Sequence, residues 1–416
     1  MSLTLDELVP IYEDLHRHPE LGRQEHRTAG IVADHLRALG YDVTTGVGGT
    51  GVVATLERGA GPTVLLRADM DALPVEEATG LPYASTATAT GADGTETPVM
   101  HACGHDMHTT CLLGAAAALA GDGRWEGRLL LVFQPDEEGG GGAREMVADG
   151  LFERFGTPDV VLGQHVAPVP VGVLGVRPGA AFAASDTLRV TLHGAGGHGS
   201  RPEATVDPVV LGAAVVQRLQ TVVSREVAAA ETVVVTVGSF HAGTAANVIP
   251  DRAVLGLSIR TADPDVRAKV LAAVERIVRG EAAAAGAPRE PEIEVVNTFP
   301  AVVNDAAACE RIREAFAEEG RWVVVDPGPV TGSEDVGILA EAAGAPCAYW
   351  LLGGADPALF ASATSVEEIR RVVDDLPSNH SPRYAPLAGP TLESGVAALV
   401  AAARSFLAAD RSTAPA

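Results

Sequence analysis

The spacing of hydrophobic and polar residues changes along the chain, and these changes predict helices that alternate with strands. Apolar residues recur at helical spacing over 4–17 and 25–39. Apolar runs over 51–57 and 63–67 predict a pair of strands separated by the turn 58–62. The elements expected next are a helix ending near Leu119, buried strands over 128–134 and 159–165, and a short helix over 142–150. Residues 84–98 have no clear period and are expected to form a loop. Strands that alternate with helices are typical of an α/β layered domain.

A different order of elements begins after about residue 184. Strands are expected over 187–193, 232–240, 253–261 and 292–298, with helices over 207–226 and 265–285. The order β-α-β-β-α-β is the ferredoxin-like pattern of an α+β domain. We therefore expect an inserted satellite domain over 184–297, which divides the first domain into 1–183 and 298–416. The second part of that α/β domain contains a helix over 305–319, a strand over 347–352 and a helix over 387–408.

Length and charge narrow the classes of function. The chain has 416 residues, more than one ordinary core contains, so two domains are expected. The formal net charge of −24 argues against nucleic acid as a partner, because phosphate binding needs clustered Lys and Arg. The same charge repels anionic substrates, so a carboxylate substrate would need positive charge from metal ions or Arg within the site.

Cysteine content and the absence of an apolar leader predict where the protein works. The four cysteines are too few to form a disulfide framework in a chain of this size. Residues 1–20 show no secretory signal, and the apolar stretch at 111–120 is shorter than the ~20 residues of a membrane span. We expect a cytoplasmic enzyme with no membrane partner.

Potential metal ligands cluster at 101–108, which reads His-Ala-Cys-Gly-His-Asp-Met-His. A thiolate and an imidazole two positions apart, Cys103 and His105, would both be satisfied by a cation. Three predicted buried strands also end in ionisable residues, and ligands of open α/β sheets bind at the carboxyl ends of strands. These residues are Asp69 and Asp71 after the first strand, Asp136, Glu137 and Glu138 after the second, and His165 after the third. The sequence therefore predicts one crevice with a metal site, which collects Asp69, Cys103, His105, Glu137, Glu138 and His165.

The adjacent carboxylates Glu137 and Glu138 suggest a division of roles in which one binds metal and the other transfers protons. By itself, such a pair is more often a solvated acidic loop. The glycines 139–142 lack the Lys-Ser/Thr of a P-loop and the spacing of a dinucleotide site, so we exclude both. They are better explained as backbone that passes close to a metal site.

The order of motifs along the chain resembles the M20 metallopeptidases, and within them the amidohydrolase branch of aminoacylases, hippurate hydrolases and auxin-conjugate hydrolases. The resemblance rests on HRHPELGRQE at 16–25, RADMDALPVEE at 67–77, MHACGHDMHT at 100–109, FQPDEEGGGGAREMVADG at 133–150, GGHGSRP at 196–202, NVIPDRAVLGLSIRT at 247–261, GSED at 332–335 and NHSPRY at 379–384. It implies a zinc-peptidase-like α/β catalytic domain with the inserted satellite domain.

The resemblance also implies two divalent metal ions per subunit, with zinc the first choice and manganese, nickel or cobalt as alternatives. The residues at the family's ligand positions are Cys103, His105, Glu138, His165 and His380. Glu137 falls at the position of the general base, and Asp69 at that of an aspartate that orients a ligand. Peptidase relatives have a histidine where this chain has Arg67, which favours the Cys/His ligand set. Without the resemblance, His380 would be read as a surface residue.

In the satellite domain, the resemblance assigns three residues to the substrate. His198 would stabilise the oxyanion, often across a dimer, while Asn247 and Arg260 would hold the carbonyl and the carboxylate. A guanidinium suits the carboxylate of an amino acid. The alternative for these positions is a structural loop histidine and a surface arginine. A homodimer formed through the satellite domain is implied by the resemblance alone.

The sequence thus predicts a metal-dependent hydrolase that cleaves the amide bond of small N-acyl amino acids. A dipeptidase or an N-acetyl-diaminopimelate deacetylase on the same scaffold is the first alternative. A non-catalytic protein that binds metal or an amino acid is the second, and the presence of Glu137 beside the ligand positions argues against it.

Overall fold

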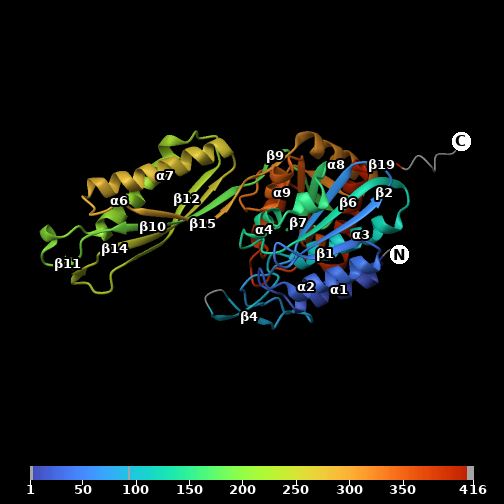
Figure 1. The fold of residues 1–416 in the computed structure, drawn as a ribbon, viewed down its shortest axis with the longest axis horizontal. Helices are drawn as coiled ribbons and strands as arrows, with labels where there is room; N and C mark the ends of the chain where they lie inside the picture. The colour runs from blue at the N-terminus through green and yellow to red at the C-terminus, as the bar shows by residue number, and fades with distance from the viewer. Residues whose placement is uncertain (1–2, 92–93, 410–416) are drawn as a thin grey trace. The chain divides into compact units, whose positions relative to one another are not determined.

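The computed structural model describes residues 3–91 and 94–409, and it divides into two compact units. Unit 1 comprises Met1–Gly179, Val303–Gly328 and Val336–Ala416, and unit 2 comprises Ala180–Val302 and Pro329–Asp335. Each unit has its own hydrophobic core. Figure 1 shows unit 2 in the green-to-gold middle of the colour range and unit 1 at both ends of it. The chain therefore leaves unit 1 and returns to it.

A mixed sheet forms the centre of unit 1, and its middle strands are parallel. In order, these are β6 (Trp125–Gln134), β3 (Thr63–Asp69), β7 (Val160–Pro170) and β18 (Cys347–Ala355). The flanking strands are β1 (Asp42–Val47), β2 (Gly51–Arg58), β8 (Val173–Gly175), β17 (Val323–Val325) and β19 (Ala408–Ala409). All side chains of 129–133 in β6 are fully buried, because both faces of a largely parallel sheet are covered. The predicted α/β class is confirmed.

The strands predicted as a pair, 51–57 and 63–67, are not neighbours, and this part of the prediction was wrong. β6 lies between β2 and β3, antiparallel to the first and parallel to the second. At Gly61, in the turn between them, an added Cβ would lie 2.9 Å from the carbonyl oxygen of Glu126. The turn between β2 and β3 therefore passes over the start of β6. β6, which has the longest buried apolar run of the three, lies between β2 and β3.

Two groups of helices pack on this sheet. The first group contains α1 (Leu5–Arg17), α2 (His26–Ala38), α3 (His105–Gly121), α8 (Ala306–Glu319) and α11 (Ala388–Phe406). The second contains α4 (Gly142–Ala148), α5 (Leu151–Phe155) and α9 (Val336–Ala343), and it contacts β6 and β7. α3 and α11 approach closely at Gly395, where an added Cβ would lie 2.5 Å from Sγ of Cys111. Together with α1, α2 and the strands β3 and β7, α11 buries α3 on nearly all sides, including the first turn, which carries His105.

Two connections in unit 1 contain more structure than the sequence predicted. Residues 84–98, expected to be a loop, contain the short hairpin of β4 (Thr88–Thr90) and β5 (Glu96–Pro98). Strands of three residues are too short for an alternating pattern to be visible. Between β18 and α11 the chain forms η3 (Pro357–Phe360) and α10 (Val366–Asp375).

Unit 2 is a four-stranded antiparallel sheet that packs against two helices. Its main elements are β10 (Ala184–His193), α6 (Pro208–Thr221), β12 (Val233–Ala242), β14 (Arg252–Thr261), α7 (Pro264–Ala284) and β15 (Glu292–Phe299). The strand order β12-β14-β10-β15 is that of a ferredoxin-like fold. Both helices begin with an aspartate N-cap followed by proline, Asp207 for α6 and Asp263 for α7. α6 ends earlier than predicted, because a short π-helix, η2 (Val222–Glu226), follows it.

Short elements complete unit 2 and its borders. They are β9 (Gly179–Phe182), β11 (Gly197–His198), η1 (Pro202–Ala204), β13 (Val248–Ile249) and β16 (Val302–Asn304). β11 and β13 pair with each other apart from the main sheet, at the tip labelled β11 in Figure 1. Two positions that the sequence singled out, His198 and Asn247, belong to this tip or lie next to it.

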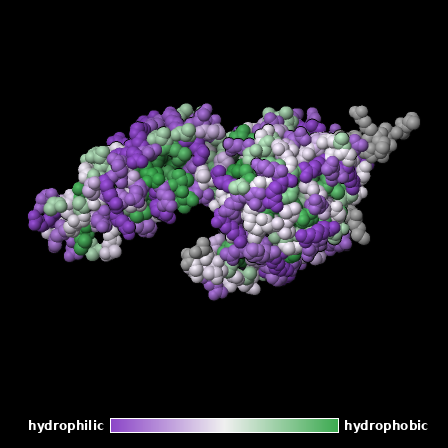
Figure 2. Space-filling model, in the orientation of Figure 1, coloured by the Kyte–Doolittle hydropathy of each residue, from purple (hydrophilic) through white to green (hydrophobic). Residues whose placement is uncertain are grey.

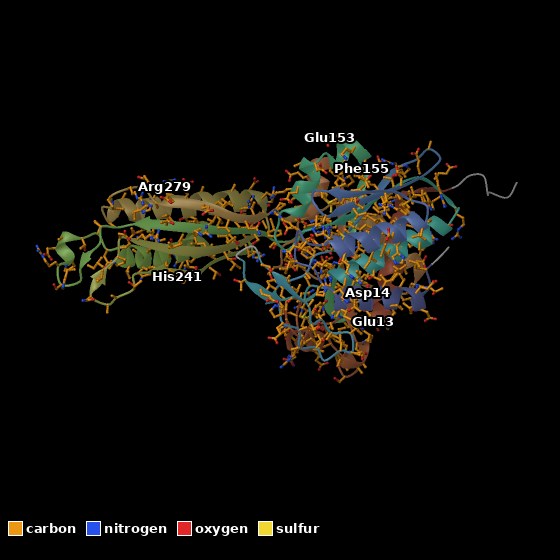
Figure 3. All side chains as sticks on the ribbon, turned by 60° about the horizontal axis from the view of Figure 1, so that its bottom comes forward. Glu13, Asp14, Glu153, Phe155, His241 and Arg279 are labelled. Carbon is orange, nitrogen blue, oxygen red and sulfur yellow. The ribbon has the colours of Figure 1, made fainter. Side chains whose placement is uncertain are left out.

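The visible surface of both units is predominantly hydrophilic, as Figure 2 shows. Arg279, labelled in Figure 3, projects from α7 and forms ion pairs with Glu275 at 2.9 Å and with Glu290 at 3.1 Å. Among the described residues, no helix combines the length and the apolar character needed to cross a membrane. The longest of them, α7, has 21 residues, but buries only one of its faces.

Phe316 offers a test of the unit 1 core. It is fully buried, and its ring meets those of Trp322 and Trp350 edge-on at 5.4 and 5.5 Å. Phe316→Ala should lower the free energy of unfolding by about 3–5 kcal/mol, because the cavity cannot close around two large rings. The measurement is guanidinium unfolding followed by tryptophan fluorescence, since all three tryptophans lie in unit 1. Leu359→Ala, at a position 51% exposed, is the control, and a loss below about 1 kcal/mol in Phe316→Ala would contradict this packing.

Candidate metal centre

The carboxyl ends of three neighbouring parallel strands bring the predicted polar residues together. Asp69 at the end of β3 pairs in register with Gln134 at the end of β6, and β7 continues on the other side of β3. The residues that follow these strands therefore meet at one edge of the sheet. Potential ligand atoms of Cys103, His105 and His165 all lie within 4.8 Å of one another, and so do those of His105, Glu137 and Glu138.

His380, which is distant in sequence, joins the same cluster. Its Nε2 lies 3.2 Å from Oε1 of Glu138, and Cys103, Glu138 and His380 form another group with ligand atoms within 4.8 Å of one another. Sγ of Cys103 lies 3.5 Å from Nε2 of His165. Unit 1 thus gathers all five residues that the resemblance assigned to metal: Cys103, His105, Glu138, His165 and His380.

Gly104 lets Cys103 and His105 face the same point. It has a φ of 85°, in the left-handed region, and it directly precedes α3. An added Cβ would lie 2.5 Å from Cγ1 of Val166 on the neighbouring strand β7. Glycine is therefore required here for two reasons, the backbone conformation and the approach of β7.

Hydrogen bonds on the far side of each imidazole determine which nitrogen faces the cluster. Nδ1 of His165 donates to the carbonyl oxygen of Val166 at 2.9 Å, which leaves the lone pair of Nε2 on the side of Cys103. Nδ1 of His105 donates to Oδ1 of Asp71 at 3.1 Å, so its Nε2 also points inward. Metal-binding histidines are commonly held by this arrangement of an outer acceptor and an inner lone pair.

The donor set fits a divalent cation. Nε2 of His105 is buried and has no hydrogen-bond partner within the described part of the chain, and the buried Oε1 of Glu138 lies 3.2 Å from Nε2 of His380, another member of the same cluster. Burial, together with the charge of Glu138, raises the pKa of the Cys103 thiol, which a bound cation would reverse by stabilising the thiolate. Buried atoms with lone pairs facing one another are unfavourable unless a positive charge lies between them.

Asp69 holds the first turn of α3, which contains His105 and His108, in place. Its carboxylate accepts from Nη1 of Arg67 at 2.7 Å and from Nδ1 of His108 at 2.5 Å. Burial would raise the pKa of Asp69, but Arg67, His105 and His108 together hold it well below its ordinary value. The nearest contact of Asp69 with the ligand cluster is 3.7 Å, from its Oδ2 to Nε2 of His105. Arg67 thus neutralises the charge of this aspartate.

Two residues that the sequence analysis did not place in the site have direct roles in its geometry. Asp71 accepts from His105 through one oxygen and from the backbone N–H of Glu138, at 2.9 Å, through the other. Asn379 donates to the carbonyl oxygens of Cys103 and Val166 at 3.0 and 3.1 Å, which fixes the loop of His380. The signal for Asp71 was present, because it lies two positions after Asp69, and alternate positions of an extended chain share a face.

The predicted substrate residues lie in unit 2, and that unit does not bring them together. His198 in β11 pairs in register with Val248, the residue after Asn247. Nδ1 of His198 accepts from the backbone N–H of Ser200 at 3.1 Å, so in a neutral ring the proton lies on Nε2. Arg260 lies near the other end of β14, where Nη1 donates to Oγ of Ser333 at 2.9 Å. Eight residues of strand separate Arg260 from the start of β14, or roughly 25 Å.

A cavity of about 450 Å³ in unit 1 adjoins the cluster. Its lining includes Glu138, Asp71, Leu73 and the threonines 95 and 97 of the β4–β5 hairpin. This volume lies within the usual range of small-molecule sites, ~300–1,000 Å³.

Comparison with known proteins identifies the family of this chain. The sequence pattern of the peptidase family M20/M25/M40 matches residues 65–378. Hippurate hydrolase of Campylobacter jejuni is 40% identical over 83% of this chain and 88% of its own length. The N-acetyl-L-cysteine deacetylase of Bacillus subtilis is 36% identical over 82% of this chain and 79% of its own length.

A solved structure extends the likeness to the whole chain. The structure of a dinuclear metal binding peptidase of the M20 family from Bacillus subtilis aligns with a TM-score of 0.75 and 28% identity. The alignment covers 96% of this chain and 98% of that one. With most of its length matched in sequence and nearly all of it in structure, this chain belongs to the peptidase family M20/M25/M40.

Proposed function

We propose that this protein is a metal-dependent amidohydrolase that cleaves N-acyl amino acids into a carboxylic acid and a free amino acid. The observation that carries the proposal is the cluster of buried thiol, imidazole and carboxylate ligands with Glu137 beside it. Glu137 is 5% exposed, and its Oε2 lies 4.0 Å from Nε2 of His105. The hippurate hydrolase and N-acetyl-L-cysteine deacetylase among the relatives support a substrate with an amide between an acyl group and an amino acid.

We propose that Cys103, His105, Glu138, His165 and His380 hold two divalent cations, most suitably zinc, with manganese, nickel and cobalt compatible with the same mixed donors. When bound, the cations supply Lewis acidity toward the amide carbonyl and lower the pKa of water. The dinuclear site of the Bacillus subtilis M20 peptidase supports the number of two. Asp71 and the carbonyl oxygen of Val166 keep the imidazoles oriented for this task.

In this proposal Glu137 moves the proton that the hydrolysis requires. Its carboxylate removes a proton from the attacking water as the water oxygen forms a bond with the carbonyl carbon. The same carboxyl group then gives the proton to the amide nitrogen as the C–N bond breaks. The glutamate returns to its starting state, and the products are a carboxylic acid and an amine.

We further propose that a homodimer completes the site. Arg260 suits the carboxylate of the substrate, Asn247 its carbonyl, and His198 the oxyanion, toward which the protonated Nε2 can donate. A single copy of unit 2 separates Arg260 from the other two by most of the length of β14. One substrate can meet all three only when they come from two copies.

The surface of unit 2 supports association. β12 and β15 are the edge strands of its sheet, and both expose apolar side chains, Val234 and Phe240 on the first, Val295 and Val296 on the second. Exposed apolar edge strands readily pair with another chain. Figure 2 shows an apolar patch that interrupts the hydrophilic surface of this unit.

Glu137→Gln tests the assigned base. We expect kcat for N-acyl amino acids to fall by about 10²–10⁴-fold, because the amide cannot accept the proton of water. Zinc content should remain that of the wild type, since Gln is isosteric and Glu138 is unchanged. The assay is a mass-spectrometric screen of N-acetyl, N-benzoyl, long-chain N-acyl and dipeptide substrates, which also separates amidohydrolase from dipeptidase activity. Glu153→Gln, on the exterior of α5 in Figure 3, is the control, and wild-type turnover in Glu137→Gln would refute the role.

Metal removal tests the ligand set. If zinc binds the folded state and not the unfolded state, it should stabilise the protein by about 4 kcal/mol at a concentration of a thousand times Kd. Apo protein should therefore melt at a lower temperature than zinc-loaded protein. In Cys103→Ser this difference in Tm should shrink by half or more, because a hydroxyl is a poor zinc ligand. Cys309→Ser is the control, since Cys309 is a core residue away from the cluster. Equal shifts in wild type and Cys103→Ser would exclude the thiolate as a ligand.

Mixing two inactive variants tests the shared site. His198→Ala and Glu137→Gln, unfolded together and refolded at equal amounts, should recover roughly a quarter of wild-type activity. Half of the dimers are then mixed, and each mixed dimer has one site with both an intact base and an intact histidine. Activity no higher than the sum of the separate variants would show that His198 acts within its own subunit or not at all.

A further inference from the structure

Asp136, the residue before the two site glutamates, has an unusual backbone conformation. It follows Pro135 at the end of β6 and has a φ of 47°, in the left-handed region that side chains other than glycine rarely adopt. The surrounding structure must hold such a residue in place. What holds Asp136 also determines the direction in which Glu137 and Glu138 leave the sheet.

Arg23 forms the first contact with Asp136, from the N-terminal segment. Its Nε donates to Oδ2 of Asp136 at 3.0 Å, and its Nη2 donates to Oε1 of Glu145 on α4 at 2.6 Å. Arg23 also has a positive φ, 67°. One guanidinium therefore connects the residue before the glutamates with the helix that follows them.

Three glycines leave room for the Asp136 carboxylate. An added Cβ on Gly22 or on Gly139 would overlap Oδ1 of Asp136. An added Cβ on Gly141 would lie 2.7 Å from Oδ2 of Asp136 and 2.6 Å from Nη2 of Arg23. Part of the glycine run after the glutamates is thus explained by the ion pair that it encloses.

Glu25 and Asp71 hold the backbone on the two sides of the turn. The backbone N–H of Asp136 donates to Oε1 of Glu25 at 2.8 Å, and Oγ1 of Thr50 donates to the other carboxylate oxygen at 2.5 Å. Glu25 is fully buried. Two residues further along, the N–H of Glu138 donates to Asp71. Glu137 lies between these two fixed points.

We propose that Arg23 and Asp136 are positioning residues, a clamp that sets the orientation of Glu137 and Glu138. The inference rests on the proposed function for the role of these glutamates. Asp136 is 10% exposed in its side chain, so its charge is largely desolvated and depends on Arg23 for compensation. Without the guanidinium, the carboxylate would turn toward water and the strained φ would relax, which moves both glutamates. Displacements of about 1 Å at catalytic groups can reduce turnover 10²-fold.

The variants that test the clamp are Arg23→Ala and Asp136→Asn. Asparagine keeps the shape of the side chain and can adopt the left-handed conformation, so Asp136→Asn should fold normally while it weakens the contact with Arg23 that holds the turn. We expect kcat to fall by about 10–100-fold in either variant, with KM within about twofold of the wild type, because the clamp touches no substrate. The double variant should lose no more than the worse single variant, since both residues act through one contact.

The matched control is Arg27→Ala. Arg27 forms an ion pair with Asp14 at 2.7 Å, and Asp14 is labelled on α1 in Figure 3. Its side chain is 40% exposed, compared with 60% for Arg23, and among the described residues its guanidinium pairs with Asp14, which lies outside the glutamate turn. Arg27→Ala should keep the wild-type kcat. This result would show that the loss of a different ion pair of the N-terminal segment does not by itself reduce turnover.

Zinc affinity gives a second readout that does not depend on finding a substrate. Competition of the apo protein with a chromogenic chelator for zinc should show an affinity at least about fivefold weaker in Arg23→Ala than in wild type and Arg27→Ala, because Glu138 is displaced. If the wild type hydrolyses no N-acyl amino acid, the proposed function fails, but this measurement still decides on the clamp. Wild-type zinc affinity in both clamp variants, or additive losses of kcat in the double variant, would overturn the proposal.

Discussion

The site depends on an electrostatic constraint, the burial of several groups that carry lone pairs or negative charge at the carboxyl ends of parallel strands. Asp69 is compensated within the chain by Arg67 and His108, whereas Nε2 of His105 has no hydrogen-bond partner in the described structure and Glu138 faces only the cluster's own His380, at 3.2 Å. Such a cluster is unfavourable in a medium of low dielectric constant unless a cation occupies it. The requirements of folding and of amide hydrolysis therefore coincide. A cation that stabilises these buried ligand atoms would also supply the Lewis acidity that the reaction needs.

Three residues with backbone conformations in the left-handed region orient side chains toward the site. Gly104, Asp136 and His380 have φ values of 85°, 47° and 71°, and each lies within two residues of a proposed ligand or is one. Such conformations reverse the chain sharply, which lets residues close in sequence face one point in space. Two of the three are not glycine, so specific contacts must hold them: Arg23 and Glu25 for Asp136, and the hydrogen bond from the N–H of His380 to the carbonyl oxygen of Ala102.

The sequence predicted the class of fold and a cluster of potential ligands around Cys103 and His105 from local signals, whereas His380 was assigned to the cluster only through the family resemblance. A strand that ends in carboxylates, or a histidine and a cysteine two positions apart, can be recognised within ten residues. The position of β6 between β2 and β3 could not be predicted, since strand order depends on which apolar run packs best against both neighbours. Asp71 and Asn379 were missed as contributors for a related reason. Their roles exist only through hydrogen bonds to residues 67 and 276 positions away in the chain.

The proposed sharing of the site between the two units would place a geometric requirement on catalysis. The carboxylate and the reacting carbonyl of an N-acyl amino acid lie within roughly 5 Å of each other, as bond lengths dictate. Arg260 and the tip that carries His198 are separated by most of β14 within one copy of unit 2. If both groups act on one substrate, they must come from different copies, and the active form must be an oligomer. The ionic chemistry would then reside within a single unit 1, while recognition of the substrate would depend on assembly.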